Sequence, residues 1–154
     1  MSDPLADLER LASTHPADAL LLIAPADHPL SRRLAASGIR PCADARRLLD
    51  HPPPRRYPLV LIAGSLETLS RTAGERLIAA LRDIHADTLY CLVDADTWPA
   101  PDMAALGLRA VGVYPRAAGR LALYHFDLYD YKRTPDWLNA RFWAHPERWD
   151  KTRW

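Results

Sequence analysis

Residues 56–96 read RYPLVLIAGSLETLSRTAGERLIAALRDIHADTLYCLVDAD, and this stretch decides the fold. It holds two apolar runs of strand length, Leu59–Gly64 and Thr88–Asp96, on either side of a segment with helical spacing from about Thr72 to Ala86. A continuous apolar run is typical of a strand that is covered on both faces, as in a parallel sheet. The helix between two such strands predicts a right-handed crossover, whose buried face would carry Leu77, Ile78, Leu81 and Ile84.

The same pattern continues toward the N-terminus. Ala19–Pro25 (ALLLIAP) is a third apolar run, and Pro4–Thr14 has helical spacing with Asp3 available as its cap. Between this run and Leu59–Gly64 lie helical segments around Leu30–Ser37 and Ala43–Asp50 and a very short strand near Arg40–Ala43. Strands that alternate with helices in this way predict a doubly wound α/β sheet.

Two strands in close succession follow Asp96. Leu108–Tyr114 and Arg120–Tyr131 flank the short connection PRAAG, which has proline and glycine at its ends. Strands joined so closely pair antiparallel. We therefore expect one α/β domain over residues 1–154: a mostly parallel, Rossmann-like sheet of about six strands that ends in an antiparallel hairpin (1–131), with an aromatic helical tail packed on it (132–154).

Charge and composition limit the classes of function. A formal net charge of +1 argues against a surface built as a whole for nucleic acid or an acidic membrane. Seven arginines nevertheless gather in one segment that holds only two acids, and they predict either an anion-attracting surface or, as we favour, ordinary solvated charge. They are Arg32, Arg33, Arg40, Arg46, Arg47, Arg55 and Arg56.

Cysteine usage and the absence of targeting patterns favour a cytoplasmic protein. Cys42 and Cys91 lack the spacing of a zinc site or a redox pair. The N-terminus does not resemble a signal peptide, and no apolar stretch approaches the ~20 residues of a membrane helix. We expect a protein without a membrane association.

The segment 56–96 resembles the fourth strand, the following helix and the fifth strand of the class I S-adenosylmethionine-dependent methyltransferases. Their pattern DLVLxxxVLEHL is similar to Tyr57, Leu59, Val60 and Leu61 in the strand and to Ser65–Leu69 in the short element after it. The resemblance implies a sheet in the methyltransferase order. In an active member it also implies S-adenosylmethionine at the carboxyl ends of the parallel strands.

Three departures from that family argue against cofactor binding. The family has a Gly-x-Gly-x-Gly loop after its first strand, because only glycine lets the backbone approach the cofactor closely. Here that loop reads IAPADHPLSRRL, in which Pro25 and Pro29 remove two backbone donors and no glycine occurs before Gly38. The family's third strand has no counterpart, since Pro52–Arg56 lead straight into the next strand. The favoured interpretation is a reduced, non-catalytic methyltransferase-like interaction or regulatory module without a cofactor; the alternative is a small S-adenosylmethionine-dependent methyltransferase with an atypical loop.

Position in such a fold selects a set of candidate cofactor-binding residues: Asp27, His28, Asp44, Gly64, Glu67 and Asp94. Asp44 stands about where the family has an acid for the ribose hydroxyls, and Asp27, His28 and Glu67 are types that support acid–base chemistry. The simpler alternative, ordinary polar loop residues, is favoured, and no catalytic residue is identified. The six histidines lack metal-ligand spacing, so no metal site is expected.

The last 26 residues, YDYKRTPDWLNARFWAHPERWDKTRW, hold four of the five tryptophans. The aromatic and basic residues singled out there are Trp137, Arg141, Phe142, Trp143, Trp149 and Trp154. We favour two short helices that cover an open face or edge of the sheet, with a protein-partner surface as the alternative. Nucleic acid is disfavoured, because acids interrupt the basic residues. The segment also resembles the end of a family of small proteobacterial proteins of unknown function, which implies a bacterial source.

Overall fold

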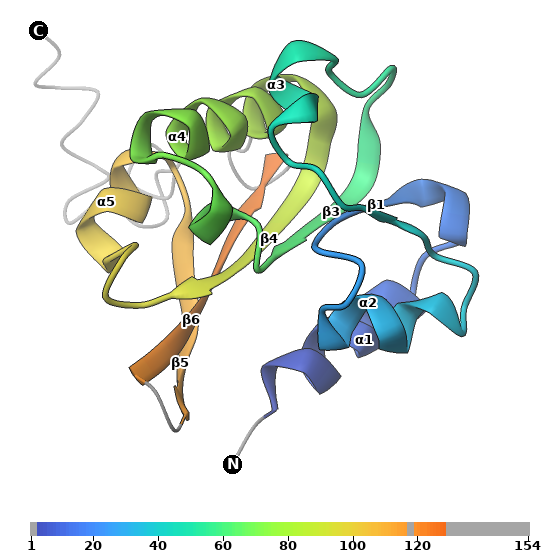
Figure 1. Cartoon of the computed structure of the whole chain (residues 1–154), viewed down its shortest axis with the longest axis horizontal. Coiled ribbons are helices and arrows are strands. Elements are labelled where there is room, and N and C mark those ends of the chain that lie inside the picture. The colour runs from blue at the N-terminus through green and yellow to red at the C-terminus, as the bar shows by residue number, and fades with distance from the viewer. Residues whose placement is uncertain (1–2, 117–118, 129–154) are drawn as a thin grey trace, which may run out of the picture.

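The computed structural model describes residues 3–116 and 119–128, and within them the chain forms one six-stranded sheet with helices on both faces (Figure 1). The strands are β1 (Leu20–Ile23), β2 (Pro41–Cys42), β3 (Tyr57–Ala63), β4 (Ala86–Asp94), β5 (Arg109–Arg116) and β6 (Gly119–Asp127). The α-helices are α1 (Pro4–Ser13), α2 (Pro29–Ala35), α3 (Arg47–Asp50), α4 (Arg71–Ala80) and α5 (Ala100–Ala105). Two short 3₁₀ turns, η1 (Ala17–Ala19) and η2 (Leu66–Thr68), and one π-helical turn, η3 (Leu81–His85), complete the described elements.

The strands lie in the order β2-β1-β3-β4-β6-β5. β1 pairs in parallel with β2 and β3, and β3 pairs in parallel with β4. β6 runs antiparallel between β4 and β5. The expected α/β class and the mostly parallel, six-stranded sheet with a terminal antiparallel hairpin are therefore confirmed in the described part of the chain.

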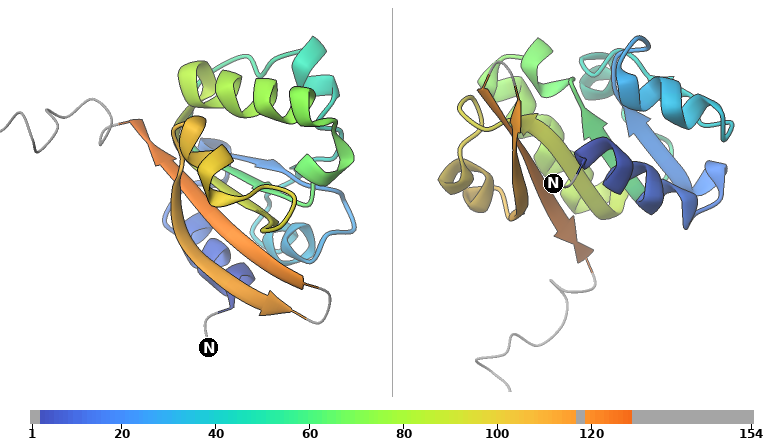
Figure 2. Two further views of the ribbon diagram at one scale, coloured as in Figure 1. Left: turned by 90° about the vertical axis from the view of Figure 1, so that its left-hand side faces the viewer. Right: turned by 90° about the horizontal axis from the view of Figure 1, so that it is seen from below.

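Helices cover the two faces of the sheet unequally. α3, α4 and α5 pack on one face, while α1 and α2 pack on the other, as the two views of Figure 2 show. The first core includes Ile62, Leu77 and Trp98, and the second includes Leu8 and Leu61. Leu59–Ala63 of β3 are at most 1% exposed, because this strand lies between both cores.

Local sequence signals set the helix starts. The side chain of Asp3 caps α1 by accepting a hydrogen bond of 3.0 Å from the backbone N–H of Leu5. Ser70 caps α4 in the same way, with a bond of 3.2 Å from the N–H of Ala73.

The expectation that Ile84 lies on the buried face of its helix is wrong. The helix widens to a π-helical turn after Ala80, so side chains beyond that point are rotated away from the α-helical positions. As a result Ile84 is 58% exposed, and His85 is buried in its place at 7% exposure.

The predicted aromatic tail lies outside the described residues. This applies to the tail's helices, to the last three residues of the expected strand Arg120–Tyr131, and to every residue singled out in the tail. Those residues are Trp137, Arg141, Phe142, Trp143, Trp149 and Trp154, and the packing of the tail stays a prediction.

Gly74 should be intolerant of alanine, because it faces the indole of Trp98. A Cβ added at Gly74 would lie 2.7 Å from Cζ2 and 2.9 Å from Cη2 of Trp98, which is only 2% exposed. Alanine gains about 1 kcal/mol of helix propensity over glycine, whereas overpacking a core costs ~1–3 kcal/mol. We expect Gly74→Ala to lower the free energy of unfolding, measured by urea denaturation followed by circular dichroism.

Trp98→Phe is the matched background for that measurement. Phenylalanine lacks the two indole atoms that the new methyl group would meet, so Gly74→Ala should become neutral or stabilising in it. An equal loss of stability in both backgrounds would show that the Trp98 contact is not the cause.

Candidate functional site

The carboxyl ends of β1, β3 and β4 lie at one edge of the sheet, which we call the carboxyl edge. The sheet order reverses direction between β1 and β3, and in open α/β sheets ligands bind at such a reversal. The loop after β1 carries Asp27 and His28, the loop after β3 carries Gly64 and Glu67, and β4 ends at Asp94. The structure therefore brings five of the six predicted site residues to one edge of the sheet, four of them on two loops and Asp94 at the end of β4.

His28 bridges the loops that follow β1 and β3. Its Nδ1 accepts a hydrogen bond of 3.1 Å from the N–H of Leu30 and so caps α2. The ring lies against Gly64, where an added Cβ would be 2.8 Å from Cδ2 of His28. Gly64 also has a φ of +67°, which favours glycine independently of that contact. The imidazole thus fills the space beside the end of β3.

The rest of the β1 loop is held by its own side chains. The hydroxyl of Ser31, a buried residue of α2, donates a hydrogen bond of 2.8 Å to the carbonyl oxygen of Pro25. This bond ties the first turn of α2 back to the end of β1. The loop that would be glycine-rich in a methyltransferase is fixed here by two bonds from within the chain.

Burial lowers the pKa of His28, and the carboxylates of Glu67 and Asp27 oppose part of that effect by favouring the charged ring. A neutral imidazole is also what the cap requires, because a protonated Nδ1 cannot accept the bond from Leu30. Geometry and burial therefore favour the same protonation state.

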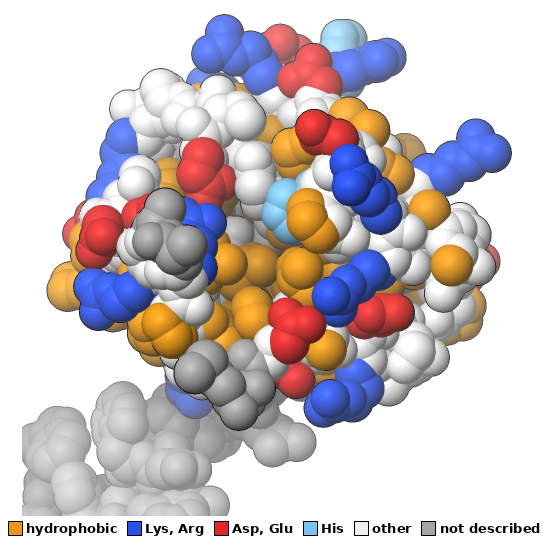
Figure 3. Space-filling model, turned by 60° about the horizontal axis from the view of Figure 1, so that its bottom comes forward, with side chains coloured by type: hydrophobic (Ala, Val, Ile, Leu, Met, Phe, Trp, Pro, Cys, Tyr) orange, Lys and Arg blue, Asp and Glu red, His pale blue; other side chains and the backbone are white. Residues whose placement is uncertain are grey.

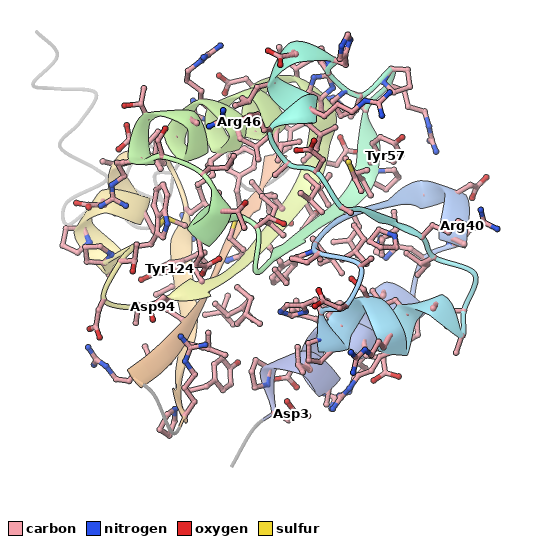
Figure 4. The ribbon with its side chains drawn as sticks, viewed as in Figure 1. Asp3, Arg40, Arg46, Tyr57, Asp94 and Tyr124 are labelled. Carbon is pink, nitrogen blue, oxygen red and sulfur yellow. The ribbon has the colours of Figure 1, made fainter. Side chains whose placement is uncertain are left out.

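The carboxylates of Glu67 and Asp94 also accept hydrogen bonds from the chain itself. Oε1 of Glu67 accepts a hydrogen bond of 3.0 Å from the backbone N–H of Asp94. Oδ1 of Asp94 accepts bonds of 3.0 Å and 2.9 Å from the N–H groups of Thr97 and Asp96, and Oδ2 lies 2.9 Å from Nη2 of Arg116. The backbone bonds from Thr97 and Asp96, with a smaller contribution from Arg116, lower the pKa of Asp94. Figure 4 labels Asp94 at the end of β4.

Asp44, the sixth predicted residue, lies at the outer end of the same edge. It follows β2, which is tied to the end of β1 by a bond of 3.2 Å from the N–H of Ala24 to the carbonyl oxygen of Cys42. Its Oδ1 accepts a bond of 3.3 Å from the N–H of Arg47 and so supports the start of α3. The Asp44 side chain is exposed.

Sequence reasoning missed the two hairpin arginines at this edge. Arg116 pairs with Asp94 at 2.9 Å, and Arg120 pairs with Asp96 at 3.2 Å. These pairs exist because β6 is inserted next to β4, which brings the tip of the hairpin beside the end of β4. The sequence does contain a signal for these pairs: arginines lie within and directly after the connection PRAAG, and aspartates stand at both ends of DAD, residues 94–96.

The arginine-rich segment does not form one basic surface. Arg40 and Arg46 lie on separate parts of the molecule in Figure 4. Arg33 lies 3.3 Å from Asp3, and Arg56 lies 3.5 Å from Asp87. The segment is therefore spread over several elements, in agreement with ordinary surface charge.

Figure 3 shows the side of the molecule that carries α1, α2 and the tip of the hairpin. Hydrophobic side chains gather there in a central hollow, and charged side chains stand around it. Leu121 and Tyr114 are half-buried apolar residues at the carboxyl edge, since Leu121 pairs with both Tyr114 and Asp94. Apolar surface is thus available beside the engaged polar groups.

Two classes of site find no support in residues 3–116 and 119–128. No group of three or more His, Cys, Asp or Glu side chains in this part is placed to hold a metal ion. No helix of the described part has the length and apolar character needed to cross a membrane.

Comparison with known proteins gives a family and no activity. The model of a family of unknown function (DUF6231) matches residues 2–154. No curated protein matches the chain. The family description names no cofactor, substrate or partner, so the methyltransferase resemblance stays a prediction.

The lowered pKa of His28 predicts how stability depends on pH. The unfolded chain takes up a proton at His28 below pH ~6.5, while the folded chain does so only at lower pH. The contribution of His28 to the free energy of unfolding is therefore complete above the pKa of the unfolded chain, and it is lost as the pH falls toward the pKa of the folded chain. His28→Asn keeps a capping oxygen but does not titrate, so we expect its stability relative to wild type to improve as the pH falls from about 8 to 5.

Urea denaturation at several pH values measures this difference, and NMR titration of His28 should give a pKa below its ordinary value. Parallel stability curves for the two proteins would contradict the assignment.

Proposed function

We propose that the chain, which belongs to the DUF6231 family of unknown function, acts as a non-catalytic, methyltransferase-like interaction or regulatory module. One observation carries the proposal: three polar side chains at the carboxyl edge, those of His28, Glu67 and Asp94, are bonded to their own chain. His28 caps α2, Glu67 holds the N–H of Asp94, and Asp94 holds Arg116. A cofactor that used these side chains would have to compete with the hydrogen bonds that they already make within the chain.

The strand order supports the methyltransferase-like part of the proposal. Doubly wound nucleotide-binding sheets have the order 3-2-1-4-5-6. Without its third strand that order becomes 2-1-4-5-6, which corresponds to β2-β1-β3-β4-β5 here, with β6 inserted before the edge strand. The turn η2 follows β3 where the resemblance implies a short element after the fourth strand.

The apolar hollow in Figure 3 supports an interaction role. A contiguous apolar surface with a polar rim is typical of a site that binds another protein. S-adenosylmethionine carries a charged amino-acid group and ribose hydroxyls, which need polar groups that are free to bind them. The carboxyl edge offers apolar surface and engaged polar groups, and this combination suits a protein partner better than a cofactor.

A small S-adenosylmethionine-dependent methyltransferase is the second candidate. The exposed carboxylate of Asp44 favours it, since this side chain follows β2 where a ribose-binding acid would stand. Glu67 would be the other cofactor-binding residue.

Calorimetric titration of the full chain with S-adenosylmethionine and S-adenosylhomocysteine separates the two candidates. We expect no binding tighter than ~1 mM, because the polar groups of the edge are engaged. Micromolar binding that Asp44→Ala abolishes and the control Asp50→Ala preserves would establish the methyltransferase alternative and defeat our proposal. Asp50 is a suitable control, since it is also exposed and lies on α3.

A photo-crosslinking residue at Leu121 tests the interaction role in cells. Leu121 lies at the carboxyl edge, whereas Val113 is an exposed valine on the neighbouring strand. We expect a discrete crosslinked protein partner from position 121 and none from position 113. Absence of any crosslink at 121, or equal capture at both positions, would speak against a partner at this edge.

A further inference from the structure

A groove lies between α1 and the β5–β6 hairpin, away from the carboxyl-edge loops. We call it the α1 groove; its volume is about 320 Å³, and its lining includes Leu11, Thr14, Tyr90, Val111 and Leu123. Val111 is 49% exposed, although it is a large apolar residue in a strand. The groove is therefore apolar surface that other described residues leave accessible.

The unequal covering of the sheet creates the α1 groove. On this face α1 and α2 cover β1 and β3, and the core beneath them extends outward to Leu92 of β4 and Leu123 of β6. Seen from below in Figure 2, α1 lies beside the hairpin and does not extend over β5. The opposite face has α4 and α5 over the corresponding strands. One half of one face thus lacks a covering helix within the described residues.

A buried polar atom beside the groove lacks a partner. Tyr90 in the groove stacks on its cross-strand neighbour His125, with ring centroids 5.5 Å apart. Nδ1 of His125 is buried and has no hydrogen-bond partner within the described part of the chain. Buried polar groups are nearly always paired in a complete structure. A donor supplied from outside the described residues would satisfy this atom.

We propose that residues 132–154 of the same chain occupy the α1 groove. The described chain ends at Leu128, one residue beyond the end of β6, which contributes Leu123 to the groove, and 26 residues follow it. Leu123 lies five residues before Leu128, a distance of about 17 Å along a strand. A helix of ~11 residues spans the same distance, so a segment that begins at Thr134 and turns back along β6 reaches the groove.

The chemistry of the two surfaces also matches. The segment supplies Trp137, Phe142 and Trp143, large side chains that are stabilised by removal from water. An indole N–H can donate a hydrogen bond to an imidazole nitrogen, and Nδ1 of His125 has no partner among the described residues. A segment of the same chain has a high effective concentration at the groove, whereas a separate partner must offset the entropy lost on association. The inference holds whether or not the carboxyl edge binds a partner.

Paired valine substitutions on β5 test the proposal in the full-length chain. Val111 lines the groove. Val113 is 54% exposed and precedes Tyr114, whose hydroxyl lies 3.5 Å from Asp7 of α1. Alternation from Tyr114 therefore points Val113 to the opposite face. Val111 does not follow the same alternation, because the register of β5 against β6 shifts at an irregularity between Ala110 and Gly112. Val111→Arg should block the groove, and Val113→Arg adds the same charge to the same strand as the control.

The readout is the fluorescence of the tail tryptophans in a Trp98→Phe background. We expect Val111→Arg to shift the emission to the red, to increase quenching by acrylamide, and to lower the melting temperature by ~5 °C through the loss of aromatic burial. Val113→Arg should leave all three unchanged. Thr14→Arg, on the α1 wall of the groove, should reproduce the effect of Val111→Arg, so the result does not depend on one variant's stability.

Other occupants give distinguishable results. Quenching that changes on dilution would assign the groove to a second copy of the chain and overturn the proposal. Red-shifted, readily quenched emission in the parent protein, unchanged by Val111→Arg and Thr14→Arg, would show that the segment does not dock there and would leave the groove to a different protein.

Discussion

The parallel pairing of β3 with β1 on one side and β4 on the other is the constraint on which the rest of the structure depends. Parallel neighbours can be joined only by crossovers. The crossover from β1 to β2 carries α2 on one face of the sheet and the crossover from β3 to β4 carries α4 on the other, so β3 is covered on both faces. That is why Leu59–Ala63 are all apolar and at most 1% exposed. It is also why the loops after β1 and β3 diverge at the reversal of strand order, where His28 meets Gly64.

The antiparallel insertion of β6 has two consequences at opposite ends of the sheet. At the carboxyl edge it brings the tip of the hairpin to Asp94 and Asp96, so that Arg116 and Arg120 pair with them. At the other end it releases the chain beside β4, next to a face that α1 covers only in part. A sheet that ended in a parallel crossover would carry one more helix, and that helix would cover one of its faces. The hairpin supplies two strands without that helix, which explains why apolar surface such as Val111 lies open on β5.

Local sequence patterns were sufficient to predict the strands and most helix starts, because apolar runs and helix caps depend on only a few neighbouring residues. The three buried strands, the hairpin and the Asp3 cap all follow from such patterns. Ile84 was misplaced because a change of helical type rotates every later side chain, and no residue in LRDIH announces it. The contact of Trp98 with Gly74 and the pairing of Arg116 with Asp94 join residues more than 20 positions apart. Such contacts depend on strand order, which a single sequence specifies only through the whole fold.

Two features of the carboxyl edge belong to one packing arrangement. The loop after β1 has no glycine and carries His28, and the loop after β3 has Gly64 where the ring of His28 packs. In a methyltransferase the glycines after the first strand leave room for a ligand. Here that loop carries His28, whose imidazole occupies the space beside the end of β3, and Gly64 is the residue that makes this space large enough. Replacing this loop with glycines would therefore remove the cap of α2, while the carboxylates of Glu67 and Asp94 would still be held by backbone N–H groups. The residues that would have to change together lie in three separate parts of the chain, and this coupling is the physical argument behind the proposed interaction role.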